Sequence, residues 1–293
     1  MNYQEYLTAL RRKATEIRIN TLKAISNAGS GHTGSSLSAV DILVALYYGE
    51  NHEGPFMNID PVKPGWEDQD YFVLSKGQAA PVLYSILVDL GYFDADELNF
   101  YKQMNSLLSV SPRSRIPGVA VSSGAPGQGL SSAVGLALAL RMDRARNKVF
   151  TLIGDAEFAT GDVWESLLYA GHNKLGNMVV IVDRNTIQLD GIVRNLNIAD
   201  PIAEKFDAIG FRTINVFAGH DYDQLLDAFE KAISETRLPV AIVCKTVKGK
   251  GVDFAENKGF YHDTPLSEQE LEEAIRSLTR YQESLSNIAG HYE

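Results

Sequence analysis

Five short runs of consecutive apolar and β-branched residues divide the chain, and each is followed by a polar or glycine-containing turn. The runs occupy residues 71–75, 149–153, 178–183, 212–217 and 239–245. Strands that are covered on both faces show continuous rather than alternating apolar residues, as in parallel sheets flanked by helices. The pattern therefore predicts an α/β fold with a doubly wound, mainly parallel sheet and helices on both faces.

Helical periodicity fills most of the segments between these runs. Residues 1–20 predict an amphipathic helix, residues 129–145 a largely apolar one, and residues 93–102 a helix with an Asp94 to Glu97 capping box. Two further helices are expected to begin at Asp221 and Ser267. We find no internal repeat or linker, so residues 1–293 are expected to form one domain with a helical C-terminal tail.

Three segments show no clear element: residues 29–36, 105–128 and 246–265. They are rich in Gly, Ser and Pro but also contain apolar and aromatic residues, which argues against simple linkers. Irregular segments of this length inside a compact domain are usually either functional or disordered.

Charge and composition exclude several classes of function. The 27 Lys and Arg against 37 Asp and Glu give a formal net charge of -10, which disfavours nucleic-acid binding. The single cysteine, Cys244, excludes an intrachain disulfide and a zinc site with several cysteines. No apolar run reaches the ~20 residues that cross a bilayer, and the N-terminus is not a signal peptide. We therefore expect a soluble, cytoplasmic protein.

Polar side chains follow two of the predicted strands. Asp155 comes directly after the run that ends in Gly154, and Asn185 follows the next run, 30 residues further on. Asp155 could cap the helix expected around 161–173, but Asp162 is better placed for that role. Carboxylate and amide oxygens with a backbone carbonyl are ligands that Mg²⁺ or Ca²⁺ accepts, together with phosphate oxygens and water.

The "GDA" at 154–156 with Asn185 downstream resembles the thiamine diphosphate motif, normally Gly-Asp-Gly followed by Asn, and the surrounding sequence is similar to transketolases. Three further segments agree in order: "SGHTGSSLSAVDILVALYY" (30–48), "SGAPGQGLSSAVGLALA" (123–139) and "CKTVKGKGVDFAENKGFYHDTPL" (244–266). The resemblance covers nearly the whole chain. It implies the thiamine diphosphate-binding N-terminal half of a transketolase, present as a separate subunit.

The resemblance also implies roles for individual residues. The implied metal ligands, for Mg²⁺ or Ca²⁺, are Asp155, Asn185 and the backbone carbonyl of Ile187. The implied contacts to the thiamine rings and the diphosphate are Gly124, Ala125, Pro126, Gly154, Ala156, Gln78 and His262. His32 and His262 are the implied catalytic residues, and Glu165 corresponds to a buried carboxylate at a subunit interface.

Three positions depart from the transketolase pattern. Ala156 replaces the third glycine, Gln78 replaces a histidine near the diphosphate, and Ser111 replaces a histidine that binds donor hydroxyls. Gln keeps its hydrogen-bonding capacity but cannot become charged. Arg113, close to Ser111, could pair with an anionic substrate, although such loop arginines are more often solvated. These changes predict an altered donor, such as an unusual ketose or a ketoacid.

The resemblance implies a two-carbon ketol or acyl transfer that this chain does not perform alone. In this family a glutamate from the pyrimidine-binding domain supports the cofactor, and no such domain follows before Glu293. We therefore expect a C-terminal transketolase-like partner subunit that supplies this glutamate, in a heterotetramer with two copies of each chain. The alternatives are a non-catalytic regulatory subunit with the same fold and the α subunit of a 2-oxoacid dehydrogenase.

Overall fold

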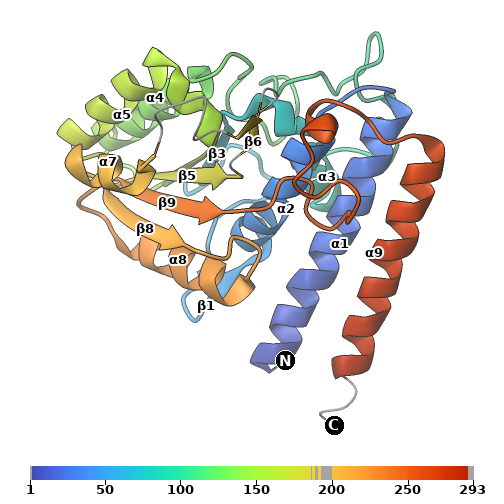
Figure 1. Cartoon of the computed structure of the whole chain (residues 1–293). Coiled ribbons are helices and arrows are strands. Elements are labelled where there is room, and N and C mark those ends of the chain that lie inside the picture. The colour runs from blue at the N-terminus through green and yellow to red at the C-terminus, as the bar shows by residue number, and fades with distance from the viewer. Residues whose placement is uncertain (1, 186, 189–190, 193–199, 290–293) are drawn as a thin grey trace.

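A parallel sheet forms the centre of the molecule (Figure 1). The computed structural model describes residues 2–185, 187–188, 191–192 and 200–289. Within them the sheet has five strands in the order β3-β4-β5-β9-β8, and every neighbouring pair is parallel. The strands are β3 (Tyr71–Leu74), β4 (Val149–Gly154), β5 (Met178–Arg184), β8 (Arg212–Val216) and β9 (Val240–Lys245). All five apolar runs are therefore strands, and the predicted fold class is confirmed.

Helices cover both faces of this sheet, as Figure 1 shows. On one face lie α4 (Gln128–Met142), α5 (Gly161–His172) and α7 (Ile202–Ala208), against buried side chains such as Ile153 and Val182. On the other face lie α2 (Thr33–Tyr48), α3 (Ala80–Asp89) and α8 (Tyr222–Ser234), against side chains such as Leu152 and Ile181. Successive strand residues point to opposite faces, which explains why both cores need continuous apolar runs.

The N-terminal and C-terminal helices pair at one side of the molecule. Helix α1 (Tyr3–Asn27) lies antiparallel to α9 (Glu268–Ala289), and α1 also contacts α2 and α3 (Figure 1). The predicted starts at Asp221 and Ser267 are confirmed, since Asp221 accepts from the Gln224 N–H at 3.1 Å and Ser267 from the Glu270 N–H at 3.3 Å. The two remaining strand pairs of the described residues are short and antiparallel, β1 (Glu50–Asn51) with β2 (Gly54–Pro55) and β6 (Ile187–Gln188) with β7 (Gly191–Ile192).

Three local predictions were wrong. Residues 93–102 contain a 3₁₀ helix, η2 (Ala95–Phe100), because Asp94 accepts from the Asp96 N–H at 2.9 Å, one residue earlier than a capping box requires. Helix α2 already begins at Thr33, inside a segment without a predicted element. Helix α5 begins at Gly161, so Asp162 lies within its first turn and makes no side-chain cap bond to any described residue.

Among the described residues, no helix is both long enough and apolar enough to cross a bilayer.

Helix α4 comes unusually close to the end of β3. A Cβ atom at Gly129 would lie 2.5 Å from the Cα of Ser75, whereas one at Gly135, in the same helix, would meet no described atom within 4 Å. We predict that Gly129→Ala lowers the free energy of unfolding by about 1–3 kcal/mol, because backbone must move to admit the methyl group. Gly135→Ala, the matched control, should raise it by up to about 1 kcal/mol through helix propensity. Urea denaturation of both variants measures the two effects, and equal stabilities would contradict the close approach.

Candidate cofactor and active site

The two metal-ligand candidates lie together at the carboxyl edge of the sheet. Gly154 ends β4 directly beside Asp183 of β5, so Asp155 and Asn185 leave neighbouring strands at the same edge. Both side chains are buried, with 3% and 4% of their surfaces exposed. Ile187 begins β6, which lies against η4 (Gly259–His262), the turn that carries His262. The structure therefore brings the candidate oxygen ligands to the edge of the sheet where the turn of His262 also lies.

A buried carboxylate that the sequence analysis did not identify joins two of the predicted cofactor loops. Glu157, in η3 (Asp155–Ala159), accepts hydrogen bonds from the N–H of Gly154 at 2.8 Å, the N–H of Gly127 at 3.1 Å and the Ser75 hydroxyl at 2.8 Å. Burial raises the pKa of Glu157 despite these three donors. Glu157 thus fixes the Gly154 turn against the loop that precedes α4. Its position three residues after Gly154 was the available signal, since that spacing suits a capping residue.

The loop of Gly124, Ala125 and Pro126 forms an exposed rim beside the turn that carries Gln78. A Cβ atom at Gly77, next to Gln78 in η1 (Gly77–Ala79), would lie 3.3 Å from the Cα of Gly124 and 3.4 Å from the Ser111 hydroxyl oxygen. The Ser123 N–H donates to the Pro112 carbonyl at 3.0 Å, which holds this rim against the Ser111 segment. The positions of Gln78 and Ser111, which depart from the transketolase pattern, therefore lie in neighbouring segments beside this rim.

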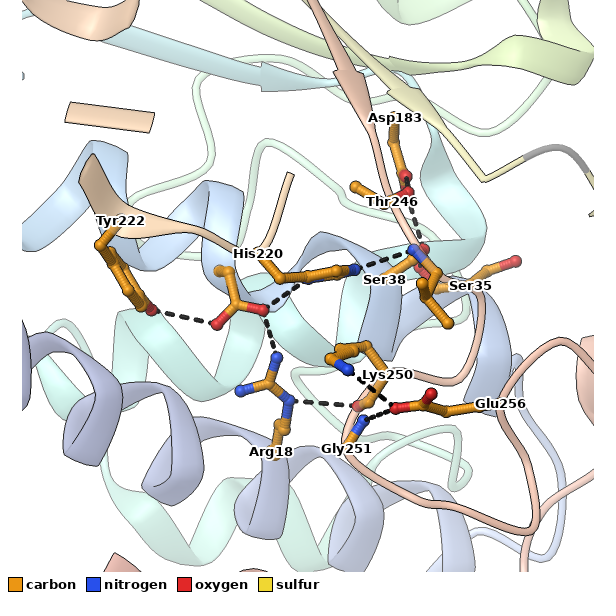
Figure 2. A network of polar contacts seen from close by, with 12 residues as sticks. Arg18, Ser35, Ser38, Asp183, His220, Tyr222, Thr246, Lys250, Gly251 and Glu256 are labelled. Atoms are coloured by element: carbon orange, nitrogen blue, oxygen red, sulfur yellow. Dashed lines mark hydrogen bonds and ion pairs between the residues drawn. The ribbon is translucent and has the colours of Figure 1, made fainter. Parts of the chain in front are cut away.

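A buried ion pair lies beneath the carboxyl edge of the sheet. The Lys76 ammonium pairs with the Asp183 carboxylate, and both side chains are almost fully buried. Ser38 of α2 donates to Asp183 at 2.7 Å, and Thr246 after β9 donates to it as well (Figure 2). Lys76 also donates to the Ser35 carbonyl at 2.8 Å. Burial would raise the pKa of Asp183, but Lys76 and the two hydroxyls hold it below its usual range.

The two candidate catalytic histidines face each other. The rings of His32 and His262 meet edge to face, with their centroids 5.6 Å apart. His32 directly precedes α2, and His262 ends η4. The segment of residues 246–262 reaches α2 because Gly34 leaves room for it: a Cβ atom there would lie 3.0 Å from both the Lys248 side chain and the Tyr261 carbonyl. The Gly249 N–H also donates to the Gly34 carbonyl at 3.1 Å.

Lys248, like Glu157 and Lys76, was not selected by the sequence analysis. Its ammonium contacts Nδ1 of His262, and the negative charge of Asp155 acts on it. Burial and the nearby Lys76 lower the pKa of Lys248 to about 8. Burial and the Lys248 charge likewise lower the pKa of His262 to about 4, and burial lowers that of His32. An ammonium group can only donate, so Nδ1 of His262 accepts and the ring proton lies on Nε2.

The remaining predicted residues are Arg113, Ala156 and Glu165. Arg113 is exposed, and Ala156 follows Asp155 in η3. Glu165 is exposed on α5 in this single chain, close to Leu168 and Tyr169, which are 53% and 45% exposed. The prediction for Glu165 was a carboxylate buried by a second subunit, and burial by that subunit stays a prediction.

The arrangement as a whole has the charges and donors that a phosphate group could bind. Buried oxygen ligands from Asp155 and Asn185 lie close to the buried cations Lys76 and Lys248, and neutral histidines line the same edge. Ligand sites at the carboxyl ends of strands are the rule in open parallel α/β sheets. No group of three His, Cys, Asp or Glu side chains in the described part of the chain is arranged to hold a metal ion, so a cation would need the amide, carbonyl and phosphate oxygens too.

Comparison with known proteins identifies the class of protein to which the chain belongs. Residues 10–286 match the family described as transketolase, thiamine diphosphate binding domain. The fold and the site thus define a thiamine diphosphate-binding domain. The chain is 36% identical over 272 residues to the 6-deoxy-6-sulfo-D-fructose transketolase subunit SqwG of Clostridium sp. (strain MSTE9), covering 92% of this chain and 96% of that protein.

Two further similarities extend the comparison. An apulose-4-phosphate transketolase subunit of Actinobacillus succinogenes is 35% identical, with 92% of this chain and 95% of that protein covered. A crystal structure of transketolase from Campylobacter jejuni superposes with a TM-score of 0.86 at 30% identity, over 95% of this chain but 43% of the other. The chain therefore belongs to the transketolase family. This match favours the transketolase prediction over the 2-oxoacid dehydrogenase alternative.

The histidine and lysine contact makes a prediction about protonation. We expect the imidazole of His262 to titrate with a pKa of about 4 in the folded chain, and Lys248→Met to raise this pKa towards the ordinary value of 6.5. Lys258→Met, which removes an exposed lysine of the same segment, is the matched control and should leave the pKa unchanged. Nuclear magnetic resonance of the imidazole Cε1–H signal over pH 3–8 measures all three.

The same depressed pKa affects stability in a defined direction. Between pH 6.5 and about 4 the unfolded chain protonates this histidine while the folded chain does not, so its contribution to stability falls as the pH is lowered through that range. A pKa of His262 at or above 6.5 in the wild type would contradict the contact between Lys248 and His262. An equal rise of this pKa in Lys258→Met would contradict it too.

Proposed function

We propose that the chain is the N-terminal, thiamine diphosphate-binding subunit of a split transketolase, which transfers a two-carbon ketol unit from a ketose donor to an aldehyde acceptor. One observation carries the proposal. The chain covers 96% and 95% of two relatives that are named as transketolase subunits, but 43% of the Campylobacter jejuni transketolase chain. A protein of this length would need a second subunit to provide the rest of a transketolase.

The residues of the cleft fit a metal-bound diphosphate. We propose that Asp155, Asn185 and the carbonyl of Ile187 hold Mg²⁺ or Ca²⁺, since hard cations prefer oxygen ligands. Lys248 carries a positive charge close to Asp155 and would offset the negative charge of the diphosphate. Gly124, Ala125 and Pro126 would contact the thiamine rings from the exposed rim, and Gly154 with Ala156 would approach the diphosphate through backbone groups.

The bound cofactor supplies the carbon nucleophile that takes up the ketol unit. The protein's own contribution is to orient the reactants and to hold protons at defined atoms. His262 keeps its proton on Nε2 because Nδ1 is occupied by Lys248, so it would act as a neutral hydrogen-bond donor. Burial also lowers the pKa of His32. His32, which faces His262, would bind an oxygen of the substrate. Because both histidines are neutral, other residues would have to balance the negative charge of an anionic substrate.

We propose that the donor is an unusual ketose with an anionic tail. Ser111 replaces the histidine that binds donor hydroxyls in the transketolase pattern, so an uncharged hydroxyl would contact the donor there. Gln78, which replaces the histidine near the diphosphate, lies in the neighbouring turn and cannot become charged either. Arg113 is exposed near Ser111 and would pair with the anionic end. The names of two relatives give sulfonated or phosphorylated sugars as their substrates, which supports a charged tail.

The partner that completes the site would be a C-terminal transketolase-like subunit with the supporting glutamate. The exposed Leu168 and Tyr169 beside Glu165 on α5, with Met142 at 75% exposure on α4, offer it an apolar surface. We propose a heterotetramer of two such pairs, since the cofactor lies between the two kinds of domain in this family. The single, buried Cys244 supports our proposal of a cytoplasmic location.

A second candidate function rests on Ala156, Gln78 and Ser111. If these changes abolish turnover, the chain is a non-catalytic cofactor-binding subunit with a regulatory role. The two candidates share cofactor binding and differ in the activity of the reconstituted pair.

Calorimetric titration tests the cofactor and the metal. Thiamine diphosphate with Mg²⁺ is titrated into the chain reconstituted with its partner. We predict that Asp155→Ala weakens binding roughly a hundredfold or more, because it removes the charged metal ligand. Asp143→Ala removes an exposed carboxylate at the end of α4 and is the matched control. Equal affinities of the wild type and Asp155→Ala for thiamine diphosphate with Mg²⁺ would contradict the assignment of the metal site.

Reconstitution tests the reaction itself. The chain alone, with cofactor, Mg²⁺, donor and acceptor, is expected to produce no ketol transfer, and addition of the partner subunit should restore it. Among donors, we predict higher kcat/KM for a sulfonated or phosphorylated unusual ketose than for xylulose 5-phosphate, and a lower value with Arg113→Gln. Robust turnover by the chain alone would exclude the split-enzyme proposal, and turnover of no donor by the pair would favour the non-catalytic subunit.

A further inference from the structure

A polar cavity lies outside the cofactor cleft, between α1, α9 and the turn of residues 250–256. Its volume is about 360 Å³, which falls within the range of small-molecule sites. The side chains that define its chemistry are Arg11, Arg18, Asp253, Glu256, Ser277 and Tyr281. None of the residues assigned to the metal, the thiamine rings or the donor lines it, so the proposed function does not account for this cavity.

Arg18 presents one nitrogen of its guanidinium group to the cavity. The side chain is 6% exposed, Nη2 pairs with the Asp41 carboxylate, and Nε donates to the Lys250 carbonyl at 3.2 Å (Figure 2). Among the residues that the structure describes, Nη1 has no hydrogen-bond partner, and it is not enclosed by protein atoms either. A guanidinium nitrogen that is open to a cavity, on a side chain that is otherwise buried, can donate to an anion.

The position of Arg18 is fixed by the network behind it. Asp41 also contacts Nδ1 of His220 at 2.7 Å and accepts from the Tyr222 hydroxyl at 3.1 Å, and Nε2 of His220 accepts from the Val247 N–H at 2.8 Å (Figure 2). Burial would raise the pKa of Asp41, but Arg18 and His220 hold it well below its usual range. Arg18 is therefore a rigid donor, and binding a ligand would not need to order it.

A second guanidinium group lies on the same side of the cavity. Arg11 and Arg18 are seven residues apart on α1, with Thr15 between them, so they share one face of the helix. Arg11 is half-buried, and no described residue pairs with its guanidinium group. The two arginines together can hold a doubly charged or bidentate anion.

The opposite side of the cavity suits hydroxyl groups. Asp253 is exposed and makes no hydrogen bond or ion pair with a described residue. Glu256 accepts from Lys250 and from the Gly251 N–H, both at 3.1 Å (Figure 2). Ser277 and Tyr281 of α9 add two hydroxyl groups. Carboxylates and hydroxyls hydrogen-bond to polyols, and the two carboxylates would repel a second anionic group.

We propose that this cavity binds a polyhydroxylated small molecule with one anionic end, namely a sugar acid or a sugar phosphate. Arg11 and Arg18 hold the anionic end, and Asp253, Ser277 and Tyr281 hold the hydroxyl groups. The site is independent of the cofactor. It adjoins the segment of residues 246–262 that carries Lys248 and His262, because Arg18 and His220 both bond to its backbone. A ligand here would fix that segment from the outside.

Calorimetric titration of the full chain with D-gluconate, D-glucose 6-phosphate and D-glucose tests the proposal. The first two probes distinguish a carboxylate from a phosphate, and uncharged glucose tests the need for an anion. We expect saturable binding of at least one anionic probe, no binding of glucose, and a roughly tenfold or greater loss of affinity in Arg11→Gln, the loss of one charged hydrogen bond. Arg276→Gln removes an exposed arginine of α9 outside the cavity and should leave the affinity unchanged.

Each other outcome overturns the proposal. Failure of both anionic probes to bind would show that the cavity does not bind a ligand of this class. Equal losses of affinity in Arg11→Gln and Arg276→Gln would show that the effect comes from the net charge of the chain and not from a contact in the cavity. Loss in Arg113→Gln without loss in Arg11→Gln would place the sugar in the cofactor cleft. Because the titration needs neither thiamine diphosphate nor the partner chain, its failure leaves the transketolase proposal untouched.

Discussion

The buried ion pair between Lys76 and Asp183 joins the elements on which the cleft depends. Lys76 follows β3, Asp183 lies near the end of β5, and the hydroxyls of Ser38 and Thr246 bring α2 and the end of β9 to the same carboxylate. Removal of one partner from such a pair leaves an uncompensated buried charge, which costs about 3–5 kcal/mol. Asn185 and Lys248 each stand two residues from a member of this group, so the same contacts that hold the sheet edge also position the candidate ligands.

The sequence predicts the sheet well because the sheet depends on local pattern. Strands β4, β5 and β9 are covered on both faces, and their unbroken apolar runs identify them. Asp155 and Asn185 were found because a polar residue after such a run must lie at the carboxyl edge. The start of α2 was missed because His32 forms no cap bond with the described residues and Gly and Ser follow it. Tertiary contacts with the 246–262 segment stabilise that start instead.

The residues that the sequence analysis missed have long-range partners. Lys76 pairs with a carboxylate 107 residues away, and Glu157 accepts from Ser75, 82 residues earlier in the chain. A lysine between Ser75 and Gly77 has the sequence pattern of a solvated turn residue, and the burial of Lys76 follows only from how β3, β5 and α2 meet. Lys248 illustrates the same limit, since its effect on His262 requires the 246–262 segment to fold back on Gly34.

Glu157 has a consequence for how the cofactor site is assembled. With three donors from Ser75, Gly127 and Gly154 satisfied inside this one chain, the two glycine turns are held in place before any ligand arrives. Binding a phosphorylated molecule at this edge would therefore sacrifice little chain entropy on this side of the cleft. The turns that this chain would contribute to the proposed site are thus already ordered. The entropy lost on binding would come mainly from the segment that covers the exposed rim at residues 124–126.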